Sequence, residues 1–164
     1  AEQRILGVEQ LLPYGVTARV EAYDRHTTDA RPLYTNASAE LSTFPEISWD
    51  RMRVDRTESR DRGVELQAAR SGAGRMDWSL SYALASSNDI VDGREVPRAL
   101  DQRHAVHGDW SFKPASNAWR LSVGGVWHSG WPYTPTTLTL RTLVNSSNQL
   151  VLHPERSLGE LNSR

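Results

Sequence analysis

The stretch at residues 16–25 reads Val16-Thr17-Ala18-Arg19-Val20-Glu21-Ala22-Tyr23-Asp24-Arg25. Side chains change face at every residue of a β-strand, so this order predicts a strand with one weakly apolar and one strongly polar face. The same alternation recurs further along, where one parity carries bulky side chains: Trp78, Leu80, Tyr82 and Leu84. The sequence therefore predicts a sheet with one apolar side, rich in aromatic residues.

Six strands of this kind are expected, at residues 3–11, 16–25, 63–70, 76–86, 104–113 and 118–129. Short turns join them in pairs at residues 12–15, 71–74 and 114–117, where proline, glycine, serine and asparagine favour reversal of the chain. Long polar connections at residues 26–60 and 88–102 separate the pairs, and a dense mixed-charge run fills 50–62. Beyond Gly130 we expect a loop, or a short hairpin arm at residues 137–144.

Turns that are short at one end and connections that are long at the other are typical of a transmembrane β-barrel. The mean hydropathy of −0.58 does not oppose this, because only alternate residues of a barrel wall meet lipid. No run approaches the ~20 apolar residues of a spanning helix. Turning Arg19 toward hydrocarbon would cost about 2–4 kcal/mol at the bilayer midplane, so Arg19 is expected to face the lumen.

A soluble β-sandwich would show the same alternation, with the apolar parity in its core. The aromatic residues favour the membrane. Four of the six tryptophans are predicted to lie within strands on the apolar parity: Trp78, Trp110, Trp119 and Trp127. Of these, Trp78 and Trp119 lie close to short turns, where an interfacial girdle would fall. The test is whether Trp78, Leu80, Tyr82 and Leu84 point away from any enclosed interior.

Composition restricts the remaining classes. The chain has no cysteine, so disulfides and thiolate metal sites are excluded. With 19 basic and 20 acidic residues, neither a nucleic-acid-binding face nor a polybasic membrane patch is indicated. Six strands do not close a barrel, since the smallest transmembrane barrels have eight, and no charged and apolar leader opens the chain. We therefore expect an internal piece of a larger barrel.

Several segments resemble the C-terminal half of the barrel of TonB-dependent outer-membrane receptors, and the resemblance covers nearly all of the chain. It lies in residues 6–9 and 20–25, in Arg62-Gly63-Val64-Glu65-Leu66, and in the tail at residues 159–164. The most specific segments are Pro97-Arg98-Ala99-Leu100-Asp101-Gln102-Arg103-His104 and Val126-Trp127-His128-Ser129-Gly130-Trp131-Pro132-Tyr133-Thr134-Pro135. In this family an Asp-x-Arg segment opens a strand, and a Gly-x-Pro-Tyr-Thr segment ends one at the outer rim.

The resemblance implies that residues 1–164 belong to an all-β, antiparallel, up-and-down barrel of roughly 22 strands in the bacterial outer membrane. The plug domain and the terminal strands would lie outside this stretch. The implied function is energy-coupled uptake of a large, scarce solute, such as a ferric siderophore-like chelate, a cobalamin or an oligosaccharide. Implied partners are outer-membrane lipid, the receptor's own plug domain, a TonB-type energy-transducing protein and the transported solute, without nucleic acid or a cofactor.

Two groups of residues are candidates for the site. Ligand contact is expected from aromatic and charged residues near the outer rim: Trp131, Tyr133, Arg94 and Glu95. The aromatics could stack on a chelate or sugar ring, or could belong to an aromatic girdle. Polar side chains expected to face the lumen, in ion-pair ladders or against the plug, are Arg19, Glu21, Arg25, Glu65 and Arg120.

Metal and catalytic sites are not predicted. His104 and His107 have opposite parity within one strand, and the other histidines lie far apart in sequence. Residues 88–93 lack the spacing and distal glutamate of a calcium loop. His128 and Ser129 are adjacent in a strand, so they point to opposite faces and fail as a catalytic dyad. A soluble all-β carbohydrate-binding module remains the alternative, and a barrel enzyme is the third option.

Overall fold

The computed structural model describes residues 1–36, 44–72, 74–116, 118–133, 136–143 and 149–156. The described fold is all-β and every pairing with a given register is antiparallel, as expected from the alternation. None of the described segments is a helix of the length and apolarity that would cross a bilayer. The elements are β1 (Glu2–Leu12), η1 (Pro13–Gly15), β2 (Val16–Thr28), β3 (Leu33–Asn36), η2 (Pro45–Ile47), β4 (Arg51–Val54), β5 (Arg56–Arg70), β6 (Met76–Val91), β7 (Arg94–Pro97), β8 (His104–Phe112), β9 (Leu121–His128), β10 (Thr136–Leu143) and β11 (Gln149–Arg156).

The chain divides into two compact units. The first unit contains Ala1–Thr27, Arg60–Ser87 and Asp101–Gly130, and the second contains Thr28–Ser59, Asn88–Leu100 and Trp131–Arg164. Each unit is described separately.

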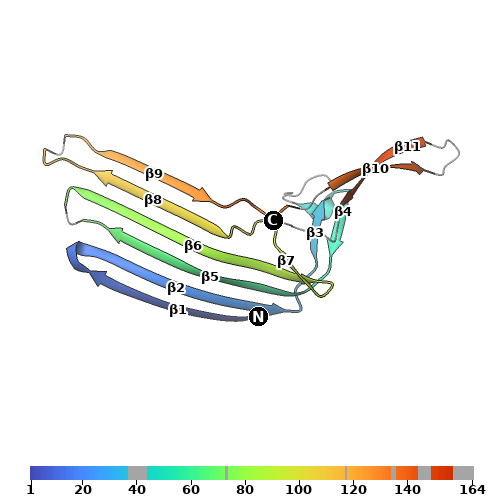
Figure 1. Cartoon of the computed structure of the whole chain (residues 1–164), viewed down its shortest axis with the longest axis horizontal. Helices are drawn as coiled ribbons and strands as arrows, with labels where there is room; N and C mark the ends of the chain where they lie inside the picture. Colours follow the sequence, from blue (N-terminus) through green and yellow to red (C-terminus); the bar gives the residue numbers. More distant parts are fainter. Residues whose placement is uncertain (37–43, 73, 117, 134–135, 144–148, 157–164) are drawn as a thin grey trace. The chain divides into compact units, whose positions relative to one another are not determined.

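The first unit is a single meander of strands in the order β1-β2-β5-β6-β8-β9 (Figure 1). Each long strand lies beside the previous one in the chain, which confirms the up-and-down order of the six predicted strands. Among the described residues β1 and β9 form the two edges of this sheet. The turn at residues 12–15 is also confirmed, because Gly15 has a φ of 71° after Pro13 and Tyr14.

One side of the meander, which we call the apolar face, carries the even-numbered residues of β1, β2, β5, β6 and β8 and the odd-numbered residues of β9. Register places Trp78 opposite Trp110, and Trp110 opposite Val123. Leu6 lies opposite Ala22, and Val8 opposite Val20. Further members of this face are Val16, Ala18, Val64, Leu66, Ala68, Met76, Leu80, Tyr82, Leu84, Val106, Phe112, Leu121 and Trp127.

The opposite side, the polar face, carries the alternate residues of the same strands. Tyr23 fixes the correspondence between β2 and β5, because its hydroxyl lies where a Cβ on Gly63 would be, at 2.6 Å. On this face Asp77 lies opposite Ser111, and Ser111 opposite Ser122. The polar face is not uniform, since it also includes Ile5, Leu11 and Val126.

No described side chain of the apolar face is buried. Leu6 is 74% exposed, Leu80 51% and Trp127 59%. Where the structure describes side chains, which excludes those of β10 and β11, Val54 of the second unit is the one hydrophobic residue that is buried. The described part of the first unit holds one sheet, and no second layer in it covers Trp78, Leu80, Tyr82 or Leu84.

Several predicted boundaries were wrong. β5 begins at Arg56 rather than Gly63, and β6 continues to Val91 rather than ending near Ser86. The added residues of β5 are polar on both faces, and those of β6 are polar as far as Asp89, so their alternation gave no apolar signal at these positions. β9 begins at Leu121, so Trp119 and Arg120 precede the strand, although the ring of Trp119 lies 5.8 Å from that of Phe112 between centroids.

The second unit shows that the predicted long connections contain hairpins. β3 pairs with β4 inside residues 26–60, and β7 pairs with the end of β6 inside residues 88–102. Asp92 and Gly93 form the turn before β7 with φ values of 50° and 74°, the geometry that Asp-Gly favours. β10 pairs with β11, so the expected hairpin arm is confirmed over residues 137–143, and residue 144 lies outside the described residues. The alternative of a continuous loop beyond Gly130 was wrong.

The hairpin of β3 and β4 is held by side-chain hydrogen bonds. Asn36 is 2% exposed, and its Nδ2 donates to Oδ1 of Asp50 at 3.1 Å and to the Pro45 carbonyl oxygen at 3.4 Å. Arg53 donates through Nε to Oδ1 of Asp55 at 2.7 Å, and this hydrogen bond raises the pKa of the guanidinium above its ordinary value. The guanidinium of Arg53 therefore keeps its positive charge near neutral pH.

Candidate functional site

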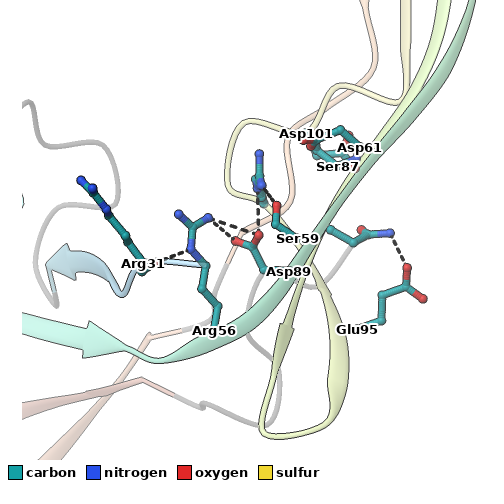
Figure 2. Close-up of polar contacts among 10 residues, drawn as sticks. Arg31, Arg56, Ser59, Asp61, Ser87, Asp89, Glu95 and Asp101 are labelled. Carbon is teal, nitrogen blue, oxygen red and sulfur yellow. Dashed lines mark hydrogen bonds and ion pairs between the residues drawn. The ribbon is translucent and has the colours of Figure 1, made fainter. Parts of the chain in front are cut away.

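A buried carboxylate organises the second unit. Asp89, on β6, is 6% exposed and lies between two guanidinium groups. Nη1 of Arg56 donates to both carboxylate oxygens at 3.1 and 3.2 Å, and Nε of Arg98 donates to Oδ1 at 3.0 Å (Figure 2). Arg98 also donates to the hydroxyl of Ser59, which is 4% exposed. We call these four residues the Asp89 cluster.

The local sequence explains how the cluster forms. Arg56 and Ser59 begin β5, Asp89 is near the end of β6, and the Asp-Gly turn returns the chain through β7 to Arg98. Nε of Arg56 additionally donates to the Arg31 carbonyl oxygen at 2.7 Å, and the hydroxyl of Thr57 donates to the Ile90 carbonyl oxygen at 3.4 Å. Charge-assisted bonds to a buried carboxylate are strong, so the cluster fixes three segments of the second unit to one another.

A second polar group lies in the first unit, on the polar face. The backbone N–H of Ser87 donates to Oδ1 of Asp101 at 3.1 Å, and the Ser87 hydroxyl donates to Oδ1 of Asp61 (Figure 2). Asp101 is 4% exposed. The aspartate of the Asp-x-Arg segment therefore accepts a backbone donor of β6 immediately before β8 begins.

The candidate ligand residues all belong to the second unit. Trp131 and Tyr133 are 48% and 58% exposed, in the segment that follows β9. Arg94 and Glu95 are consecutive and exposed on β7, so they point to opposite faces of that strand. Oε1 of Glu95 accepts a hydrogen bond from Nδ2 of Asn88 at 2.9 Å. The two residues of β7 therefore cannot contact one ligand from the same face.

The residues expected to face the lumen share the polar face. Arg19, Glu21 and Arg25 alternate along β2, and Arg19 forms an ion pair with Glu21. Glu65 has the parity of Gly63 on β5, beside Tyr23. Arg120 precedes β9, and its Nη2 lies 3.9 Å from Oδ2 of Asp77. These contacts are ion pairs between neighbours on one face of the meander.

The histidines are engaged separately. His104 is on the apolar face, with Nδ1 2.8 Å from the Tyr82 hydroxyl, whereas His107 is on the polar face, with Nε2 3.1 Å from Oδ2 of Asp109. The hydroxyl of Ser129 accepts the backbone N–H of His104 at 3.2 Å, and Nδ1 of His128 lies 2.9 Å from the Ser129 carbonyl oxygen. Within the described ranges no three His, Cys, Asp or Glu residues are grouped to hold a metal ion.

Sequence reasoning missed the Asp89 cluster. Asp92-Gly93 was a local signal for the hairpin, and it would have placed Asp89 and Arg98 on neighbouring strands. The pairing of Arg56 with Asp89 depends on the register of β5 against β6, which no local motif indicates.

Comparison with protein-family models, with curated proteins and with solved structures gave no match. The functional assignment therefore depends on the geometry and on the segments quoted under Sequence analysis.

Proposed function

We propose that this chain forms part of the barrel wall of a TonB-dependent receptor, which takes up a large, scarce solute across the bacterial outer membrane. The observation that supports the proposal most is the apolar face of the meander. A soluble domain hides such a face in a core, and large exposed apolar patches mark contact surfaces. Here the face runs across six strands with no buried side chain. In the proposal this face contacts the hydrocarbon chains of the bilayer.

The height of the apolar face fits a bilayer. On β6 it runs from Met76 to Leu84, and at ~3.3 Å per residue this covers about 26 Å of strand. A strand tilted by ~40° would then cross about 20 Å, close to the ~25 Å apolar band of outer-membrane barrels. Charged residues take over on β5 at both ends of this stretch, at Arg62 and Arg70. Aromatic residues at the turn end, Trp78 and Trp110, correspond to one interfacial girdle.

The polar face would then line the lumen. Ion pairs such as Arg19 with Glu21 supply the wetted interior that a large barrel requires. The second unit, formed by the long connections and the segment after β9, would carry the solute contacts of Trp131 and Tyr133, with Arg94 on one face of β7 or Glu95 on the other. The Asp89 cluster stiffens that unit. The plug domain and a TonB-type energy-transducing protein would be partners through other parts of the protein.

Two measurements on the complete protein test the proposal. In the first, the protein is fractionated from cells and refolded with and without lipid vesicles. We expect recovery with the outer membrane and folding only when an amphiphile is present. A compact, water-soluble monomer would refute the membrane assignment and favour a soluble carbohydrate-binding module.

The second measurement identifies the solute. A deletion strain is grown on a panel of chelated iron, cobalamin and oligosaccharide sources, and the intact gene is returned as the control. We expect growth to fail on one class and to be restored by the gene. Unchanged growth on every source would contradict uptake of these solutes while leaving the barrel itself intact.

A further inference from the structure

We draw no further inference here: the strongest candidate, the surface patch of exposed apolar side chains that Phe44, Ile47 and Trp49 present around η2 in the second unit, carries none because nothing in the structure shows what covers it.

Discussion

Leu80→Arg distinguishes a lipid-facing sheet from a water-facing one. Leu80 is midway between Met76 and Leu84 on the apolar face of β6, about 13 Å along the strand from each. In a bilayer, arginine at this depth should destabilise the folded protein by about 2–4 kcal/mol, a factor of roughly 30 to 1,000 in the folding equilibrium. In water, the same substitution at a half-exposed side chain should change stability by no more than about 0.5 kcal/mol.

Ser81→Arg is the matched control. Ser81 is the adjacent residue on β6, at the same depth, and it lies opposite His107 on the polar face. Arginine there would enter the wetted lumen, so we expect a change of stability within about 1 kcal/mol. The two variants carry the same new charge and differ only in the face that receives it.

The assay follows refolding of the complete protein from urea into lipid vesicles. Tryptophan fluorescence and the mobility of the unheated protein in gels both report the folded fraction, and urea titration gives the free energy of unfolding. Equal stabilities for the two arginine variants would refute the assignment of the apolar face to lipid. Folding of either variant without vesicles would refute it as well.

Three further substitutions test the packing. Gly63→Ala should destabilise the folded protein by about 1–3 kcal/mol, because the new methyl group would lie 2.6 Å from the Tyr23 hydroxyl and 2.8 Å from a backbone oxygen of β6. Gly125→Ala is the control: its methyl group meets no atom within 4 Å, so the urea midpoint should stay unchanged. Asp89→Asn should destabilise the second unit by about 3–5 kcal/mol, since it removes the negative charge that pairs with two arginines. Faster trypsin cleavage within β7 would show this, and an unchanged cleavage rate would contradict it. Gly93→Ala should accelerate the same cleavage more modestly, by about 1 kcal/mol, because φ is 74° there, and a slower rate would count against the turn.

The sequence predicted the meander well wherever one parity was apolar. Residues 16–22 and 76–84 alternate clearly, and both lie in long strands of the first unit. The prediction failed where both parities are polar, as at residues 56–62 of β5. Those residues stay in the strand because contacts between strands, such as Ser87 with Asp61, replace apolar burial. Alternation alone does not reveal such contacts.

The candidate site was harder to predict than the fold. In the sequence Asp101 stands out only as part of the Asp-x-Arg segment, and the hydrogen bond that its carboxylate accepts from the backbone of Ser87 gives that segment a structural role. In the Asp89 cluster one carboxylate binds Arg56, which is 33 positions away in sequence, and Arg98, which is 9 positions away. Whether these side chains come together depends on the register between neighbouring strands. A strand that is polar on both faces specifies that register only weakly.

An apolar face without a packed partner also bears on how the chain can diverge. Interlocking cores penalise each change of side-chain shape, but fluid hydrocarbon accommodates leucine, valine or phenylalanine alike. Positions such as Leu80 and Val123 should therefore drift freely among apolar residues, while Gly63 beneath the Tyr23 hydroxyl should resist replacement. Homologous chains would then keep the alternation of apolar and polar residues, and a few glycines, after most residue identities had diverged.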